Sequence, residues 1–389
     1  MKILVLEYIT GGGMVGKPLP GELAKGGEAM LQALVADLAL LPQVTLRVLR
    51  DYRLPPLTVK NCSPICFIHP SHRGIASVGR CKLFPEDLMA AIQAANTHGG
   101  NTPVAKEISS RQIFRPVKNN AIEIAPIASP GQWQENWRAG LDWAEAVWIV
   151  APETNGILYS LATDVLAANK YLLGCHPEAI RICSDKLVTG TVLEKGGVDS
   201  VPGCLAQEFK NQFPPPWIIK PRNDVGCEGI RRVQSRAELG GYQAQDWILQ
   251  PYIAGETLSL SAIFAGGGAL LLTVNHQHLA WQGESLVLKA CSVNICDTDK
   301  NSCQRLCAKI ARLIPGLWGY VGIDLIRSRD RLLVVEINPR VSLSYTGIRL
   351  ALGINVAEWV VWLAKGQASL DELASKRRQI TGKEIRVMA

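Results

Sequence analysis

In the first third of the chain, short apolar runs alternate with longer segments whose apolar residues recur every three or four positions. The run KILVLEYI predicts a β-strand, and GELAKGGEAMLQALVADLALL after it predicts a helix. The alternation continues with the strands VTLRVLR and VWIVAP and the helices PEDLMAAIQAAN, NWRAGLDWAEA and LYSLATDVLAANKYLLG. Strands that alternate with helices predict an α/β domain with a mainly parallel sheet. We predict no particular structure for residues 96–130.

After residue 174 the pattern changes to short β-rich runs separated by Gly, Asn and Asp. These runs are WIIKP, GIRRV, WILQPYI, LSLSAIF, ALLLTVNHQHLAW, SLVLKACSV, YVGIDLIR and RLLVVEINP. They predict an antiparallel region that is interrupted by one helix, NSCQRLCAKIARLI. Near the end, NVAEWVVWLAKG predicts a packing helix.

The composition is that of a globular protein, since 48% of the 389 residues are hydrophobic and 19% are charged. A chain of this length predicts two or three domains. The one dense basic cluster, SKRRQITGKEIR at residues 375–386, predicts a solvated tail more readily than a nucleic-acid-binding one. Eleven cysteines are scattered through apolar patterns, which predicts reduced thiols in a cytoplasmic protein. No stretch of 18 uncharged apolar residues occurs, so we expect no membrane span.

Two carboxylates lie in the most informative stretch, GYVGIDLIRSRDRLLVVEINPR. Its two apolar runs flank SRDR and predict a β-hairpin. With a three-residue turn at Arg329–Arg331, Asp324 lies directly opposite Glu336, and Asn338 projects from the same face. The other face then carries Ile323, Leu325, Val335 and Ile337.

Directly opposed carboxylates repel each other, because Cβ atoms lie only about 4.5–5.5 Å apart in an antiparallel pair. A hard divalent cation between them, Mg²⁺ or Mn²⁺, removes that cost, and oxygen ligands suit both ions. A solvated hairpin face with screened charges explains the residues equally well. The residues alone therefore leave both interpretations open.

The stretch WIIKPRNDVGCEGIRRV combines a strand that ends near Lys220 with a loop that contains Gly226 and Gly229. Glycines let backbone N–H groups approach an anion closely, and a lysine at the strand end can reach the same phosphate groups. Loops of this kind are most often plain turns. Alone, the stretch is a weak indication of phosphate binding.

Six segments follow one another in a characteristic order: SDK at 184–186, IIKP ending at Pro221, NDVGCEG at 223–229, LQPYIAGE at 249–256, GID at 322–324 and EINPR at 336–340. In this order they resemble the ATP-grasp superfamily of carboxylate–amine ligases. The resemblance implies an α/β (α+β) ATP-grasp fold, with a pre-ATP-grasp substrate domain over residues 1–180, a lid over 181–255 and a catalytic subdomain over 256–389. It also implies an enzyme that joins a small-molecule carboxylate to an amine through an acylphosphate, using ATP and Mg²⁺ or Mn²⁺.

The residues that the resemblance implies for ATP lie in four of these segments and form three groups. They are Lys186 and Lys220; Asn223, Gly226, Cys227, Glu228 and Gly229; and Gln250, Tyr252, Ile253 and Glu256. The lysines and the glycine-containing loop would hold the phosphates. The third group would line the adenine, with Glu256 on the ribose hydroxyl groups.

The resemblance favours the metal interpretation of the hairpin. The implied ligands of two Mg²⁺ ions are Asp324, Glu336 and Asn338. The implied catalytic groups are Arg340 and Lys220, which would stabilise charge on the transferred phosphoryl group.

One position departs from the family pattern. Some peptide-forming members carry Arg where this chain has Gly322. Lys289 in SLVLKACSV is our candidate for the missing catalytic cation. A solvated strand lysine is an equally good interpretation of Lys289.

The opening KILVLEYITGGG, followed by GELAKGGEAMLQALVADL, resembles the tyramine–glutamate ligase group of methanofuran biosynthesis, or of the analogous methylofuran. This resemblance implies glutamate as acyl donor and a tyramine- or tyrosine-type amine as acceptor. A ligase of the D-alanine–D-alanine kind is the alternative, and a homodimer is compatible with either. Candidate substrate contacts are Glu7, Tyr8, Gly12, Gly13, Glu28, Glu153 and His276. For Glu28 a solvated helix position, and for His276 a half-buried strand position, remain alternatives.

The stretch EYITGGGMVGK offers a different nucleotide site, since Gly11, Gly13 and Gly16 fit the G-x-G-x-x-G spacing and Asp51 ends the next strand. That pattern is typical of an NAD(P)-dependent oxidoreductase. Prolines at positions 18 and 20 delay the helix, so we interpret the run as a flexible loop that walls the substrate pocket. A non-catalytic ATP-grasp relative is disfavoured, because the lysine and metal positions are intact.

A zinc site is a further alternative. Cys62, Cys66, His69 and His72 are zinc-ligand types, but all four fall within eleven residues. A structural zinc site usually takes two ligand pairs from separate elements. We therefore predict no zinc at this stretch.

Overall fold

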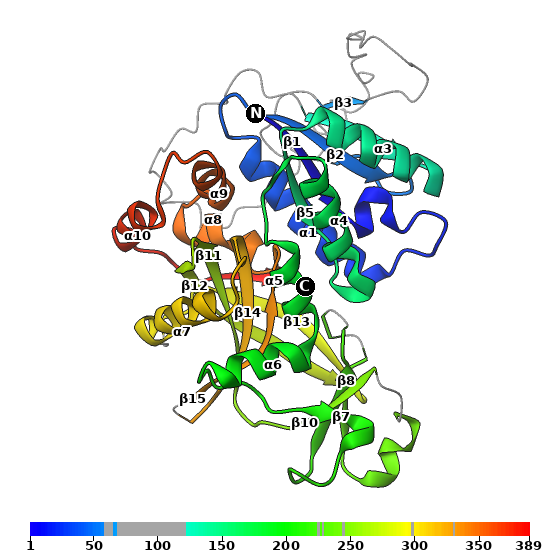
Figure 1. The fold of residues 1–389 in the computed structure, drawn as a ribbon, viewed down its shortest axis with the longest axis vertical. Helices are drawn as coiled ribbons and strands as arrows, with labels where there is room; N and C mark the ends of the chain where they lie inside the picture. Colours follow the sequence, from blue (N-terminus) through cyan, green and yellow to red (C-terminus); the bar gives the residue numbers. More distant parts are fainter. Residues whose placement is uncertain are drawn as a thin grey trace, which may run out of the picture.

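The computed structural model describes residues 1–57, 65–67, 122–223, 226–227, 229–242, 246–296, 299–329 and 331–389. In this part of the chain, a parallel sheet lies at the top of Figure 1 and an antiparallel sheet lies below it. Both kinds of sheet were predicted from the sequence, and both predictions are confirmed. The three domain boundaries stay a prediction.

The parallel sheet is buried on both faces, which is why its strands are apolar throughout. Its strand order is β3-β4-β2-β1-β5-β6. The strands are β1 (Lys2–Glu7), β2 (Thr45–Asp51), β3 (Ile65–Phe67), β4 (Ile122–Ile127), β5 (Ala146–Val150) and β6 (Tyr171–Leu172). Ile3 and Val5 pack toward helix α1 (Gly21–Leu38). Leu4 and Leu6 pack toward helices α3 (Pro130–Trp143) and α4 (Ile157–Ala167) on the other face.

The strand order reverses at β1. From β1 the chain passes through α1 to β2 on one side, whereas β5 pairs with the other side of β1. A reversal of this kind leaves a crevice outside the carboxyl ends of the two strands. Glu7 is the last residue of β1, and Glu153 lies just after the end of β5. Two carboxylates therefore lie at this crevice.

The glycine run after β1 is a tightly packed turn, which corrects the prediction of a flexible loop. Residues Ile9–Gly13 form a π-helical turn, and the Glu7 carboxylate accepts a hydrogen bond from the backbone N–H group of Thr10 at 2.6 Å. Gly12 has a φ of 92°, and a Cβ atom there would lie 2.6 Å from the Cβ atom of Ile127. Glycine is needed here because the backbone lies too close to neighbouring side chains for a Cβ atom, and not because the segment is mobile.

Replacement of Gly12 by Ala is expected to destabilise the protein more than replacement of Gly16. Both residues have a positive φ, 92° and 83°, and an alanine in that conformation costs about 1–2 kcal/mol. At Gly12 the added methyl group also meets Ile127 at 2.6 Å, whereas at Gly16 its nearest neighbour, Pro130, lies at 3.5 Å. Overpacking adds about 1–3 kcal/mol. Urea unfolding measures both variants, and equal free energies of unfolding would contradict the packing argument.

The antiparallel sheet carries most of the C-terminal half. Its strand order is β15-β14-β11-β12-β13-β9-β8-β10-β7, and β16 pairs with β13. The strands are β7 (Cys204–Leu205), β8 (Trp217–Pro221), β9 (Arg231–Val233), β10 (Trp247–Pro251), β11 (Glu256–Ala265), β12 (Gly268–Gln282), β13 (Ser285–Val293), β14 (Gly319–Ser328), β15 (Arg331–Asn338) and β16 (Ile385–Met388).

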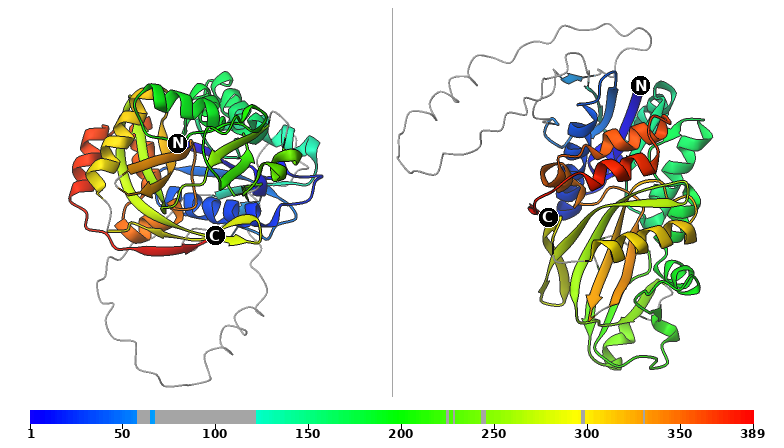
Figure 2. Two further views of the ribbon diagram at one scale, coloured as in Figure 1. Left: turned by 90° about the horizontal axis from the view of Figure 1, so that it is seen from below. Right: turned by 90° about the vertical axis from the view of Figure 1, so that its left-hand side faces the viewer.

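Helices cover both faces of this sheet. One face packs against α5 (Pro177–Ser184), α6 (Lys186–Lys195) and α7 (Lys300–Leu313). The other face packs against α8 (Tyr345–Leu352), α9 (Val356–Ala364) and α10 (Leu370–Arg378). Helices α8 and α9 also contact α1 of the parallel-sheet half, and the right-hand view of Figure 2 shows them between the two sheets.

The two halves of the molecule share two of the three buried cores in the described residues. Where α1 meets α8, the carboxylate of Asp37 accepts a hydrogen bond from the Tyr345 hydroxyl at 2.8 Å and pairs with Arg349 at 3.1 Å. The third core is small and lies around Trp217 and Leu249, on β8 and β10. This β7–β10 region therefore has a core of its own.

Three stretches differ from the sequence expectation. The end of LYSLATDVLAANKYLLG forms β6, because α4 ends at Ala167 and Asn169 takes a positive φ of 54°. Within residues 96–130, for which we predicted no structure, β4 and the start of α3 appear. The basic cluster is solvated as predicted but is ordered rather than a free tail, since Lys376, Arg378, Lys383 and Arg386 are exposed, Arg377 donates a hydrogen bond to the Leu272 carbonyl at 2.8 Å and β16 joins the sheet. The predicted helix PEDLMAAIQAAN lies outside the described residues.

The eight cysteines between Cys175 and Cys307 are free thiols. In the described part of the chain, no single helix has both the length and the hydropathy of a membrane span. The bent pair α8 and α9, whose axes differ by 102°, meets those two criteria only when its helices are counted together.

Candidate functional site

Strands β14 and β15 form the predicted hairpin. Asp324 lies directly opposite Glu336, and Gly322 lies opposite Asn338. These pairings are confirmed. Both carboxylates and the Asn338 amide thus gather at the end of the hairpin that is remote from its turn.

The turn itself is shorter than the three residues assumed. Ser328 pairs with Arg331, and a β-bulge next to the carboxylates makes up the difference, so that Leu325 pairs with Val334. Val334 is consequently the buried residue, and Val335, predicted to face the core, is only half-buried. The predicted pairing of the carboxylates is right because the bulge offsets the wrong turn length.

Neighbouring side chains hold the two carboxylates. Gln277 Nε2 and Asn338 Nδ2 donate hydrogen bonds to the two carboxylate oxygens of Asp324 at 3.1 and 3.3 Å. Burial, and then the charge of Glu336, raise the pKa of Asp324 well above its usual range. Burial acts in the same direction on Glu336, but two neighbouring lysines outweigh it and keep the pKa of Glu336 below its usual value.

Those lysines are Lys186 and Lys220. Lys186 Nζ lies 3.9 Å from Glu336 Oε2. Lys220 on β8 is 3% exposed, and burial, helped by the charge of Lys186, lowers its pKa to about 8. Asp185 explains why the two lysines meet, because its carboxylate caps α6 in front of Lys186 and pairs at 2.6 Å with Arg222, just after β8. Sequence reasoning missed this Asp185–Arg222 pair.

The loop between β8 and β9 approaches the carboxylate pair. Cys227 is half-buried beside Asp324 and Glu336, and burial followed by their charges raises the pKa of its thiol to about 12. Gly226 and Gly229 have positive φ values of 66° and 72°, which side chains rarely adopt. The described part of this loop therefore lies near the carboxylate pair, and its contact with phosphates stays a prediction.

The predicted adenine segment lies on β10 and just after it. The side-chain amide of Gln250 donates a hydrogen bond to the Val201 carbonyl at 3.1 Å. The Tyr252 ring is 37% exposed beneath the Arg232 guanidinium, which lies 4.5 Å from the ring centre. Ile253 is half-buried. Adenine contact at these positions stays a prediction.

Two predicted polar contacts have other partners. Glu256, assigned to the ribose, is exposed and forms an ion pair with Arg327 on the neighbouring strand β14. Lys289 is exposed at a bulge of β13, where its charge acts on Glu22 at the start of α1. This exposed position fits the interpretation of Lys289 as a solvated strand lysine, and its assignment as a catalytic cation stays a prediction.

His276 lies on the wrong face of its strand for a substrate contact. On β12 the side chain of Gln277 reaches Asp324, and side chains alternate along a strand. His276 consequently projects from the opposite face, where its ring packs edge-on against His278 at 4.6 Å. The alternative interpretation of His276, a half-buried strand position, therefore fits the structure.

Serine hydroxyls fill the place of the cation that the family pattern has at Gly322. A Cβ atom there would lie 3.0 Å from Ser342 Oγ. The Ser342 hydroxyl is hydrogen-bonded to the Tyr320 hydroxyl at 2.9 Å and to the Ser344 hydroxyl at 3.1 Å. The Tyr320 hydroxyl also donates a hydrogen bond to Ser261 at 3.0 Å. Sequence reasoning missed this buried hydroxyl cluster, although the alternating serines in LSLS and VSLSY are a signal for it.

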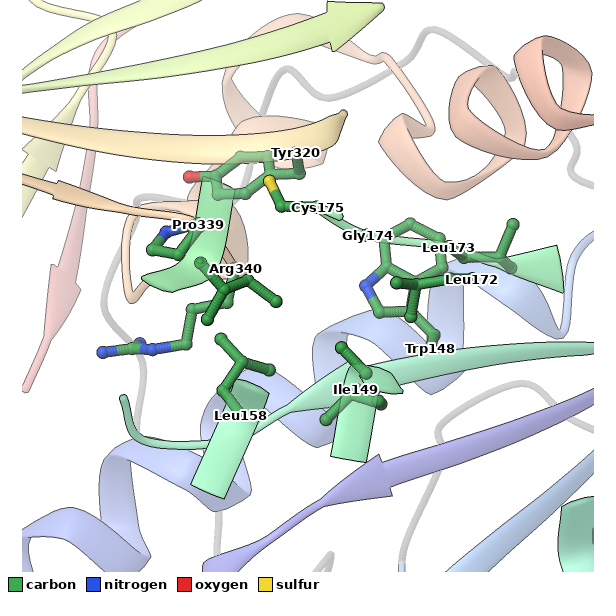
Figure 3. Close-up of a pocket in the computed structure, with 12 residues that line it drawn as sticks. Trp148, Ile149, Leu158, Leu172, Leu173, Gly174, Cys175, Tyr320, Pro339 and Arg340 are labelled. Atoms are coloured by element: carbon green, nitrogen blue, oxygen red, sulfur yellow. The ribbon is translucent and has the colours of Figure 1, made fainter. Parts of the chain in front are cut away.

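Arg340 lies where the two halves of the molecule meet. Its Nε atom lies 3.0 and 3.1 Å from the two carboxylate oxygens of Glu153. Figure 3 shows Arg340 at the edge of an apolar seam, with its guanidinium directed away from Trp148 and Leu158. The seam encloses only about 10 Å³, so it is closely packed. Glu153, predicted as a substrate contact, is thus the direct partner of Arg340.

Three predicted contacts lie in the parallel-sheet half. Glu7 is 2% exposed, and burial raises its pKa to about 6. The Tyr8 ring packs edge-on against Trp133 at 5.9 Å. Glu28 is neither a solvated residue nor a free substrate contact, because it forms an ion pair with the buried guanidinium of Arg50.

A cleft of about 720 Å³ opens beside the Arg340–Glu153 pair. This volume is typical of small-molecule sites. Residues from both halves of the molecule line it, among them Glu153, Asn155, Tyr159, Asp185, Asn223 and Asp246. Because Asp185 and Asn223 lie next to the segments that carry the two lysines, the cleft leads toward the carboxylate pair.

The donor set of the hairpin fits a hard divalent cation. Among the described residues, no three His, Cys, Asp or Glu side chains gather as a metal site. The candidate is therefore two opposed carboxylates completed by the Asn338 amide, all of them oxygen donors. Metal binding by these residues stays a prediction.

The alternative sites gain no support. The glycine run forms a π-helical turn, and α1 begins only at Gly21, so the strand-turn-helix geometry of a dinucleotide site is absent from this described stretch. Asp51 is fully buried and pairs with Arg53 at 2.6 Å. The remaining predicted residues, which lie outside the described residues or lack a described side chain, are Cys62, Cys66, His69, His72 and Glu228.

Two family models and known proteins match this chain. Residues 183–344 match the model of the ATP-grasp domain, and residues 110–180 match that of the pre ATP-grasp 3 domain. Tyramine–L-glutamate ligase of Methanocaldococcus jannaschii is 28% identical over 201 residues, which are 52% of this chain and 57% of that protein. The enzyme of that name from Methanocaldococcus fervens is 27% identical over 200 residues, 51% and 60% of the two chains.

The chain thus matches less than two thirds of the length of these relatives. Among solved structures, a protein from Archaeoglobus fulgidus assigned to the ATP-grasp superfamily superposes with a TM-score of 0.59 at 19% identity, over 93% of this chain and 88% of that one. The fold and the two matched domains agree with each other. The chain therefore has an ATP-grasp fold and contains an ATP-grasp domain, with a pre-ATP-grasp domain in front of it.

Proposed function

We propose that the protein is an ATP-dependent ligase that forms an amide from a carboxylate and an amine through an acylphosphate. The observation that carries the proposal is the opposed pair of Asp324 and Glu336 with Lys186 and Lys220 beside it, in a chain with an ATP-grasp domain. Paired carboxylates next to buried cations suit nucleotide phosphates that bind together with Mg²⁺.

The side chains supply positioning and charge. Mg²⁺ held by the carboxylate pair and Asn338 would offset the negative charge of the phosphates. Lys186 and Lys220 would hold phosphate oxygens while the substrate carboxylate attacks the γ-phosphorus and the bond to the bridging oxygen of ADP breaks. Arg340 would stabilise charge on the transferred group, and a deprotonated amine would then displace phosphate from the acylphosphate.

For the substrates we propose the γ-carboxylate of glutamate and a tyramine- or tyrosine-type amine, in the formation of a methanofuran-like or methylofuran-like cofactor. The support is the activity named for the two Methanocaldococcus relatives. The cleft beside Arg340 and Glu153, about 720 Å³, is large enough for a small carboxylate and an amine.

A trapping assay tests the ligase proposal without knowledge of the acceptor. With ATP, Mg²⁺, glutamate and hydroxylamine, we expect a hydroxamate and ADP in equal amounts, because hydroxylamine attacks the acylphosphate. Reactions that contain EDTA in place of Mg²⁺ are the control and should yield neither product. A panel of tyramine, tyrosine and glutamate then identifies the amine. The absence of both hydroxamate and ADP across a broad set of carboxylates would contradict the proposal.

A further inference from the structure

Arg340 and Glu153 form one of the least exposed ion pairs in the described structure, with side chains that are 13% and 6% exposed. Arg340 Nε faces both oxygens of Glu153, and Nη1 donates a hydrogen bond to the Val341 carbonyl at 3.2 Å. The two residues are 187 positions apart in sequence and belong to different halves of the molecule. This pair fixes the guanidinium in one orientation.

The same guanidinium lies within electrostatic reach of other carboxylates. Its positive charge acts on Asp324, Glu336 and Glu7. A buried guanidinium that loses its partner pairs with the nearest remaining carboxylate, because an uncompensated buried charge is very unfavourable. For Arg340 the remaining carboxylates include the two that are predicted to bind metal.

Glu153 is the carboxylate that pairs directly with the cation Arg340 near the hairpin. The other charged groups around it are the carboxylates Asp324, Glu336 and Glu7 and the cations Lys186 and Lys220. The apolar seam in Figure 3, which encloses only about 10 Å³, borders Arg340 and strengthens these interactions by excluding water. Removal of the Glu153 charge would leave Arg340 without its direct partner.

We propose that Glu153 is a positioning residue that holds Arg340 beside the reaction centre and away from Asp324 and Glu336, so that these carboxylates stay available for Mg²⁺. The inference rests on the proposed function for its catalytic consequence, but the effect on metal binding stands apart from catalysis. It replaces the prediction that Glu153 contacts the substrate. Its place at the end of β5, in the crevice beside β1, lets the parallel-sheet half set the orientation of a side chain in the ATP-grasp half.

The test compares Glu153→Gln with wild type by titrating Mn²⁺ in the presence of ADP and following free Mn²⁺ by electron paramagnetic resonance. We expect the Kd for Mn²⁺ to rise about 10- to 100-fold. This is the usual effect of removing a residue that does not bind the metal itself but supports the residues that do. In the hydroxylamine assay, kcat should fall and the half-saturating Mg²⁺ concentration should rise. Glu153→Asp, which retains the charge, should restore most of the Mn²⁺ affinity.

Asp37→Asn is the matched control, because the Asp37–Arg349 pair also joins the two halves but lies against α8, away from the hairpin. It should leave the Kd for Mn²⁺ unchanged. Equal Mn²⁺ affinity in Glu153→Gln and wild type would overturn the inference, as would an equal loss of affinity in Asp37→Asn. If Glu153→Gln changes only the KM for the amine, Glu153 contacts the substrate, as first predicted, and does not position Arg340. If wild type forms no hydroxamate but Glu153→Gln still weakens Mn²⁺ binding, the ligase proposal fails and this inference stands.

Discussion

The Glu336→Gln variant is expected to lose at least about 10³-fold in kcat for ADP formation, since the loss of a metal ligand removes several kcal/mol of transition-state charge stabilisation. The substitution keeps the size of the side chain and removes the charge that Lys186 and Lys220 face. A coupled assay for ADP release measures the effect. Wild-type rates in this variant would refute the metal assignment of the hairpin.

The Asp324→Asn variant is the comparison for Glu336→Gln, because we expect the charges of the two carboxylates to change the stability of the fold in opposite directions. The pKa of Glu336 is lowered in the folded protein, so its charge stabilises the fold above its unfolded-state pKa, and the Gln variant should melt at a lower temperature. The pKa of Asp324 is raised, so its charge destabilises the metal-free protein, and Asp324→Asn should melt at a higher temperature. That gain should shrink as pH falls toward 3.8, the ordinary value for Asp, where the unfolded chain also becomes protonated. Thermal scans in EDTA across pH check both signs.

The Lys220→Met variant should lose activity and gain stability. Met matches the length of the buried stem without its charge, and the loss of one cation at the phosphates should lower kcat/KM for ATP about 10²- to 10³-fold. Burial lowers the pKa of Lys220 from 10.5 to about 8, so the charged form destabilises the fold at neutral pH. We therefore expect Lys220→Met to raise the Tm of the nucleotide-free protein at pH 7.

The pH dependence tests the cause of that gain. Between pH 8 and 10.5 the unfolded chain binds a proton at Lys220 that the folded protein has released, so wild-type stability rises with pH through this window. The advantage of Lys220→Met should accordingly shrink over the same range. A constant difference in Tm would show that the packing of Met, and not the buried charge, is responsible. Lys210→Met, at an exposed position outside the site, is the control and should change neither quantity.

Sequence reasoning recovered the parts of the site that depend on local pattern. The two runs around SRDR alternate as strands do, and this was enough to place Asp324 opposite Glu336. The bulge at Val335 could not be predicted, because one extra residue leaves no mark in a run as apolar as RLLVVEI. The pairing of Asp324 with Glu336 was predicted correctly because the wrong turn length and the missed bulge offset each other.

Contacts between distant segments were beyond the sequence. The pairing of Arg340 with Glu153 depends on how the parallel sheet docks on the hairpin, which no local pattern encodes. The glycine run was misread as a flexible loop for the same reason, since the neighbour that demands a glycine at Gly12 is Ile127, on β4. His276 was assigned to the substrate because a strand pattern does not say which face meets the site.

The distribution of the three cores determines which part of the protein can move when a nucleotide binds. The parallel sheet and the C-terminal helices share a core, and the Asp37 contacts with Tyr345 and Arg349 join them again, so we expect these parts to move together. The β7–β10 region has a separate small core around Trp217 and pairs with β13 at Arg231 and Ser285, so we expect it to be the part that moves. Lys220 and Cys227 travel with that region, whereas Glu336 stays behind on β15. We therefore expect closure of the site to be a hinge motion that changes the distance between the lysine and the carboxylates, with Arg340 held in the stationary part.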